Sequence, residues 1–288
     1  MKRILKFIVN LMAIALFSMC AFSFSACNDI TTVKVEFSIY NNSAEHFYSK
    51  EDVTMSVDLY GHLAPKTVKA IKGYIKDGYF DNAFIYQLVD DYEYQYMFGD
   101  LEYNYKGEIV QKAIKPTLPG EFYSNGVYGN DIQPQAGSIG LWRSYYESDM
   151  VFNVSSEARN SGRSTLFMPT ESNNTLNGYV CMFAKYDTEA ETSKTVMSAL
   201  DAIFSNSEYF DDYVIYYTGE YDASKPNENH GLTFNCVLSS EWDENEVENL
   251  FEPEGLQYAS YARHIIRVPK TIARSGESTA KISSIKIK

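Results

Sequence analysis

Apolar and polar residues alternate along several short stretches of the chain, a pattern typical of half-buried β-strands. The first stretch is residues 33–40, in which the apolar face carries Val33, Val35, Phe37 and Ile39. Residues 53–60 repeat the alternation, and the Asn41-Asn42-Ser43 turn signal predicts that the two strands pair antiparallel. Further strands are predicted at residues 83–89, 92–98, 138–142, 165–168, 179–186, 214–218, 232–238 and 282–287.

Two longer segments carry the helical period instead. Pro65 opens the first segment, since the missing N–H of proline costs nothing in a first helical turn. Val68, Ile71 and Ile75 then share one face, and Gly78 supplies the expected stop. Residues 192–204 form the second amphipathic helix, and a shorter helix is predicted at residues 244–251. Many short strands with two main helices predict a mainly β barrel or sandwich.

The N-terminus has the pattern of an export signal. Lys2, Arg3 and Lys6 precede a mostly apolar stretch, residues 8–22, and Phe24-Ser25-Ala26-Cys27 resembles a lipobox, the cleavage signal of bacterial lipoproteins. The resemblance implies a signal peptide at residues 1–26 and lipid on the sulfur of Cys27. An ordinary secretory signal followed by an accidental cysteine, or an uncleaved anchor, stays open. We therefore expect an extracytoplasmic protein, lipid-anchored to the bacterial cell membrane through a tether at residues 27–32.

Composition narrows the choice of partners. The chain has 288 residues, 45% of them hydrophobic, so it can bury a core, and its formal net charge of -13 argues against a nucleic-acid partner. Cys181 and Cys236 either pair outside the cell or are buried free thiols. We expect no metal and no cofactor, because no phosphate-binding loop or zinc pattern occurs and the histidines are isolated: His46, His62, His230 and His264.

The order of the elements and motifs resembles the cyclophilin-type peptidyl-prolyl cis-trans isomerases. The resemblance rests on the segments Ala64-Pro65-Lys66-Thr67-Val68, Gly78-Tyr79-Phe80-Asp81-Asn82, Glu121-Phe122-Tyr123-Ser124-Asn125-Gly126-Val127 and Leu176-Asn177-Gly178. It implies a closed eight-stranded antiparallel barrel capped by two helices at residues 33–204. It also implies an α+β insertion at residues 205–270 and a closing strand of the barrel within residues 271–288.

The resemblance also implies an activity, the isomerisation of X-Pro bonds, whose barrier is about 18–20 kcal/mol. The family holds proline in an apolar pocket and places an arginine near the prolyl nitrogen. Aligned without gaps from Gly78, the family's Phe-His-Arg falls on Ile85-Tyr86-Gln87, so a neutral amide stands at the arginine position. Gln95 matches the family's glutamine, which makes Gln87 and Gln95 the catalytic-site candidates.

The same alignment assigns the substrate-binding residues. Val180 stands where many members have histidine, Thr175 where many have tryptophan, and Glu93 where the family has a pocket methionine. Trp142 replaces a small alanine beside the peptide groove. The candidate substrate-binding residues are Tyr92, Trp142, Arg143, Thr165, Phe167 and Leu176.

Two interpretations of function stay open on the sequence. The first is a peptidyl-prolyl isomerase that binds proline-containing peptide segments of exported proteins, with catalysis weakened or lost because of Gln87. The alternative is a non-catalytic surface lipoprotein that binds a partner or a carbohydrate through residues 205–270. Tyrosines in that segment favour either a binding surface or an ordinary core.

Overall fold

The fold is described from a computed structural model, which covers residues 29–43, 46–89, 95–143, 159–219, 222, 224–225, 231–242, 264–271 and 280–288. The predicted signal peptide, Cys27 and the helix predicted at residues 244–251 lie outside the described residues. Within those ranges, no helix is long and apolar enough to cross a lipid bilayer.

A long antiparallel hairpin opens the described chain. Strand β1 (Ile30–Ser43) pairs with β2 (His46–Tyr60) from Ile30 opposite Tyr60 to Ser43 opposite His46. The alternating residues of both strands point inward and are buried, which confirms the predicted antiparallel pair. Because β1 begins at Ile30, residues 30–32, which we expected in the tether, already belong to a strand.

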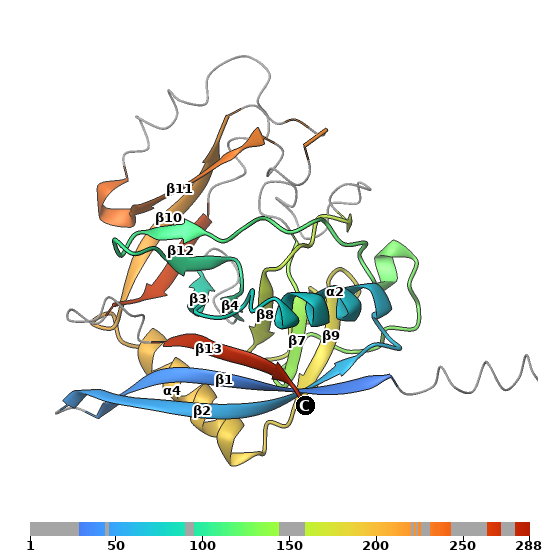
Figure 1. The fold of residues 1–288 in the computed structure, drawn as a ribbon, viewed down its shortest axis with the longest axis horizontal. Coiled ribbons are helices and arrows are strands. Elements are labelled where there is room, and N and C mark those ends of the chain that lie inside the picture. Colours follow the sequence, from blue (N-terminus) through green and yellow to red (C-terminus); the bar gives the residue numbers. More distant parts are fainter. Residues whose placement is uncertain are drawn as a thin grey trace, which may run out of the picture.

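Most of the remaining strands join this hairpin in one antiparallel sheet (Figure 1). Its strand order is β11-β10-β12-β3-β4-β8-β7-β9-β2-β1-β13, and a separate pair is formed by β5 and β6. The bounds are β3 (Tyr86–Leu88), β4 (Gln95–Phe98), β5 (Leu101–Tyr103), β6 (Ile109–Gln111), β7 (Ser138–Leu141), β8 (Leu166–Pro169), β9 (Cys181–Tyr186), β10 (Phe210–Thr218), β11 (Thr233–Leu238), β12 (His264–Pro269) and β13 (Ala280–Ile287). Two short 3₁₀ turns occur at Tyr123–Asn125 and Ser239–Glu241.

The expected closed eight-stranded barrel needs correction. The strand pairing gives an eleven-stranded sheet that has β11 and β13 at its two ends. The difference arises because strands from the expected insertion do not form a separate unit: β12 pairs with β3, and β10 lies between β12 and β11. The backbone of residues 82–85 meets β13, since Asn82 N donates to Ile282 O and Ile85 N donates to Ala280 O. A mainly β fold with two main helices is confirmed.

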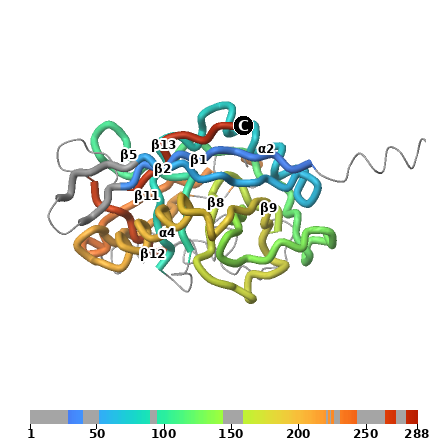
Figure 2. The backbone as a smooth tube through the Cα atoms, turned by 90° about the horizontal axis from the view of Figure 1, so that it is seen from below, coloured from blue at the N-terminus to red at the C-terminus, as the bar shows by residue number. Residues whose placement is uncertain are grey.

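The two helices are α2 (Pro65–Lys76) and α4 (Glu191–Phe204), both close to their predicted bounds. Helix α2 packs against β13, and α4 packs along β1 and β2; Figure 2 shows α4 beside β12 and α2 beside the start of β1. Ala64 at the N-terminus of α2 has no side chain that could cap it. The buried Glu121 carboxylate takes that role by accepting the Lys66 and Thr67 N–H groups at 3.0 and 2.8 Å.

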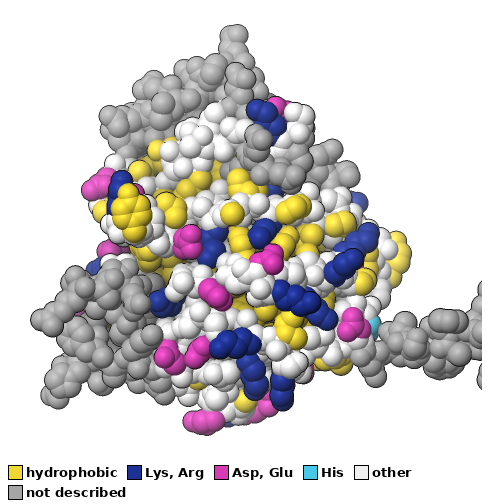
Figure 3. All heavy atoms as spheres, in the orientation of Figure 1, with side chains coloured by type: hydrophobic (Ala, Val, Ile, Leu, Met, Phe, Trp, Pro, Cys, Tyr) yellow, Lys and Arg dark blue, Asp and Glu magenta, His cyan; other side chains and the backbone are white. Residues whose placement is uncertain are grey.

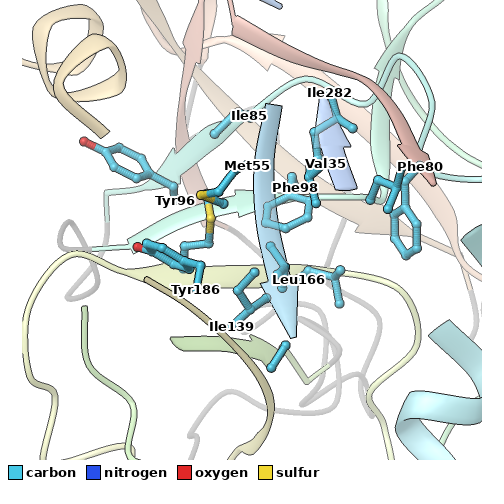
Figure 4. Close-up of a cluster of buried hydrophobic side chains, with 14 of the residues drawn as sticks. Val35, Met55, Phe80, Ile85, Tyr96, Phe98, Ile139, Leu166, Tyr186 and Ile282 are labelled. Carbon is cyan, nitrogen blue, oxygen red and sulfur yellow. The ribbon is translucent and has the colours of Figure 1, made fainter. Parts of the chain in front are cut away.

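Two apolar clusters fill the molecule on opposite faces of the central strands. The first cluster collects inward-facing side chains from β1, β2, β4, β7, β8, β9 and β13 together with both helices. Figure 4 shows part of it, with Met55, Tyr96, Phe98, Leu166 and Ile282 converging from different strands. The second cluster lies between strands β3, β4 and β8 and the added strands β10 and β12.

The two cysteines are free thiols in the structure. Cys181 is buried on β9 and shares a 3.4 Å hydrogen bond with the Thr67 hydroxyl. Burial raises the pKa of both Cys181 and Cys236 to about 12. Such thiols are inert at neutral pH, so the structure supports the buried-thiol alternative over a disulfide.

Candidate active site

Two residues expected in the proline pocket, Phe167 and Leu176, lie together with Trp142, which was expected beside the peptide groove, and all three are buried. Phe167 on β8 and Leu176 in the loop before β9 are 0% exposed, and Trp142, directly after β7, is 4% exposed. The Trp142 and Phe167 rings meet edge to face, with centroids 5.2 Å apart. We name the second apolar cluster the Phe167 cluster; its members are Phe84, Tyr86, Leu88, Met97, Leu101, Ile132, Trp142, Phe167, Leu176, Val180, Met182, Ile215, Tyr217, Ile266 and Val268.

Strands β10 and β12 supply one wall of the Phe167 cluster. Their contributions are the buried side chains of Ile215, Tyr217, Ile266 and Val268. The placement follows from pairing, because Ile266 lies opposite Leu88 and so brings β12 alongside β3. The strands of the expected insertion therefore bury the face on which the predicted proline-binding residues lie.

Tyr86 and Gln87 point to opposite faces of β3. Tyr86 belongs to the Phe167 cluster and lies opposite Met97, another member. Gln87 lies opposite Tyr96, which belongs to the first cluster. Since side chains alternate along a strand, Gln87 shares the face of Ile85 rather than that of Phe167. Tyr86, which the ungapped alignment did not select, is the β3 residue at the candidate site.

Gln95 lies on the face of the sheet that carries Phe167, at the edge of the Phe167 cluster. It begins β4 two residues before Met97 and lies opposite Pro169 of β8. The side chain is 1% exposed, and neither amide atom has a hydrogen-bond partner among the described residues. Tyr92 and Glu93 fall outside the described residues, so their predicted place beside Gln95 has no structural counterpart here.

The remaining candidate site residues differ in how deeply they are buried. Val180 is buried in the Phe167 cluster, whereas Thr175 is exposed. Arg143 is 3% exposed and engaged in interactions of its own. Thr165 is half-buried, and its carbonyl accepts the Trp142 N–H at 2.8 Å, which fixes the backbone that carries the indole. No group of metal-binding side chains occurs in the part of the chain that the structure describes.

Comparison with known proteins decides the family. Residues 46–207 match the family model of the cyclophilin type peptidyl-prolyl cis-trans isomerases, more than half of the chain. The chain belongs to the cyclophilin family. No match was found among curated proteins.

Among solved structures, two of a cyclophilin type peptidyl-prolyl cis-trans isomerase from Cryptosporidium parvum are similar to this cyclophilin-family chain. One is 16% identical, covering 58% of this chain and 83% of that chain, with a TM-score of 0.38. The other, determined in the presence of the dipeptide Ala-Pro, is 17% identical, covering 57% and 83%, with a TM-score of 0.37.

A buried carboxylate anchors Tyr86 in this family member. The Tyr86 hydroxyl donates to Asp100 Oδ1 at 3.0 Å, and Asp100 also accepts a hydrogen bond from the Thr165 side chain. Burial raises the pKa of the Asp100 carboxyl from 3.8 to about 6, and the two hydrogen bonds offset part of that effect. The donor capacity of the Tyr86 hydroxyl is therefore taken up by Asp100.

Asp100 gives the fold a measurable pH dependence. Because its pKa is higher in the folded than in the unfolded chain, its contribution to stability is complete below about pH 4 and is lost as pH rises through about 6. This titration changes the free energy of unfolding by up to about 3 kcal/mol, and we expect Asp100→Asn to abolish that change. Urea unfolding at several pH values measures it; an unchanged pH profile in the variant would contradict the assignment.

The sequence carried a signal for the residues that the motif alignment missed. Phe84, Tyr86 and Leu88 alternate with Ile85 and Gln87, which predicts that the first three share a face. Ile266 and Val268 had no comparable signal, because the pairing of β12 with β3 joins segments far apart in the chain.

Proposed function

We propose that the protein is an extracytoplasmic, lipid-anchored member of the cyclophilin family that binds partner polypeptides without isomerising them. The observation that carries the proposal is the complete burial of Phe167 and Leu176 beneath Trp142 and the strands β10 and β12. Location and anchoring rest on the signal-like N-terminus and the lipobox at Cys27.

The steric argument comes first. An isomerase must admit the proline ring to an apolar pocket and leave room for the amide to twist through its barrier of about 18–20 kcal/mol. In this chain the apolar side chains that would hold the ring are already buried together in one cluster. Trp142 packs edge to face on the Phe167 ring and covers that ring within the cluster.

The electrostatic argument is independent of the steric one. Isomerisation is accelerated by a preorganised donor near the prolyl nitrogen, and a charged guanidinium is a stronger donor than a neutral group. On β3 the residue that faces Phe167 is Tyr86, whose neutral hydroxyl donates to Asp100. Gln87 carries a neutral amide and lies on the opposite face of the strand. The β3 position that carries the family's arginine therefore supplies no charged donor.

Peptide binding is expected at a different place, the edge strand β11. It is the last strand of the sheet, and within the described residues its outer edge is paired with no other strand. A strand edge without a paired neighbour offers backbone N–H and C=O groups to an extended segment, which adds a strand by main-chain hydrogen bonds. Such binding tolerates many sequences, including proline-containing ones whose proline sits where no N–H is needed.

A single titration tests both the closed Phe167 cluster and peptide binding at β11. Labelled protein is mixed with extended proline-containing peptides while methionine methyl and backbone amide resonances are followed by NMR. We expect shifts in the amides of β11 and none in the methyls of Met97 and Met182, which are buried in the Phe167 cluster. Met55, in the first cluster, is the control. Saturable shifts of Met97 and Met182 with Met55 unmoved would show that the Phe167 cluster opens to proline.

A further inference from the structure

A row of lysines covers the outward face of helix α2. The helix buries Thr67, Val68, Ile71 and Ile75 against the sheet and contains no carboxylate. Its outward residues are basic, in a chain whose formal net charge is -13. They are the exposed Lys66, Lys69 and Lys76 and the half-buried Lys72.

The neighbouring strands continue this positive surface. On β1 and β13, Lys34 lies directly opposite Lys286. Like charges directly opposite each other destabilise a sheet. Such a locally unfavourable pair is the kind of feature expected at a functional surface. Across α2, β1 and β13, the one described carboxylate is Glu36, which accepts a hydrogen bond from Ser284, while Asp29 and Asp77 flank the ends. On the neighbouring β2, Asp58 and Asp52 accept hydrogen bonds from Thr32 and Ser38 of β1. Among the described residues, none of these lysines forms an ion pair within 4.0 Å. In Figure 3, several dark-blue side chains lie over this side of the molecule, with magenta side chains among them.

The same side of the molecule holds the start of the described chain. Lys72 Nζ donates to Thr31 Oγ1 at 3.1 Å, and Gly61 N donates to Asp29 O at 2.7 Å. Cys27 precedes Asp29 by two residues, so their Cα atoms can be no more than about 7 Å apart. A lipid on Cys27 would therefore hold this side of the protein close to the bilayer, because no long linker separates the two.

We propose that the surface formed by Lys34, Lys66, Lys69, Lys72, Lys76 and Lys286 rests on the anionic phospholipid headgroups of the anchoring membrane. The inference rests on the proposed function, since the anchor at Cys27 supplies the proximity. Charge complementarity supplies the attraction, at about 1 kcal/mol, or about fivefold, for each lysine near an anionic surface. Within the described ranges these lysines form no ion pair, although Lys34 and Lys72 donate hydrogen bonds to Ser56 and Thr31.

The test compares lysine reactivity in the full chain incorporated in vesicles. A water-soluble amine reagent labels the protein on vesicles of phosphatidylcholine alone and on vesicles of equal parts phosphatidylcholine and phosphatidylglycerol, and mass spectrometry reports each lysine. On anionic vesicles we expect Lys66, Lys69 and Lys76 to react about fivefold more slowly, with recovery at high salt. The exposed Lys106, Lys194 and Lys225 are the control and should not change.

Two results would overturn the inference: equal protection on neutral and anionic vesicles, or equal protection of both lysine sets. The same mass spectra report the modification of Cys27. Salt-sensitive protection of the α2 lysines supports the surface even if Cys27 carries no lipid. A lipidated Cys27 without protection of the α2 lysines would contradict the proposed membrane-contacting surface but support the lipid anchor. The failure of one proposal can therefore be told from the failure of the other.

Discussion

Phe167→Ala is expected to lower the free energy of unfolding by about 3–5 kcal/mol. The side chain is 0% exposed and packs edge to face on Trp142, so truncation removes its contacts and leaves a cavity in the Phe167 cluster. In an open proline pocket the same aromatic would be partly exposed, and its loss would reduce peptide binding more than stability. Chemical denaturation of wild type and variant measures the difference.

The comparison variant for Phe167→Ala is Tyr128→Ala. Tyr128 is 74% exposed, and its ring contacts only the exposed Tyr123 among the described aromatic pairs. Truncating it should change stability by less than about 0.5 kcal/mol. If Phe167→Ala cost no more than this control, the claim that Phe167 is part of a closed core would be wrong.

Ile266→Ala should destabilise the whole protein by about 2–5 kcal/mol, although residue 266 lies in the expected insertion. Ile266 is 0% exposed and lies opposite Leu88, so its side chain joins β12 to the face of β3 that carries Tyr86. We expect unfolding to stay a single transition, because the added strands and the central strands share one cluster. Denaturation followed by fluorescence and by circular dichroism checks both expectations.

Ile265→Ala provides the matched control for Ile266. The two residues are adjacent and identical in type, but Ile265 is half-buried and lies on the other face of β12. We expect it to cost less than half as much as Ile266→Ala. Two separate transitions in the wild type, of which Ile266→Ala changed only the earlier one, would instead show that residues 205–270 fold as an independent unit.

Local sequence patterns predicted the local elements well. Pro65, the Val68-Ile71-Ile75 face and Gly78 placed α2, and Gly78 adopts the left-handed conformation expected after a helix end. The alternation of residues 33–40 and 53–60 predicted the first hairpin and its antiparallel pairing. These signals succeed because each depends on neighbours within a few residues.

Relations between distant segments were predicted less well. The pairing of Ile266 with Leu88 joins two segments that no local pattern connects, so the sequence could not show that β12 extends the sheet. Strand alternation places Tyr86, rather than Gln87, on the face of β3 that carries Phe167. Phe167, Leu176 and Trp142 lie in one cluster with residues of β10 and β12, strands that no local pattern connects to them.

The most direct test of the central claim is a prolyl isomerisation assay on the purified chain. The account predicts that the cis-to-trans rate of a proline peptide stays at the uncatalysed value as protein is added. Gln87→Arg should also be silent, because position 87 faces away from Phe167. A rate that rises in proportion to the wild-type concentration would contradict the account, since it would require proline to enter the Phe167 cluster.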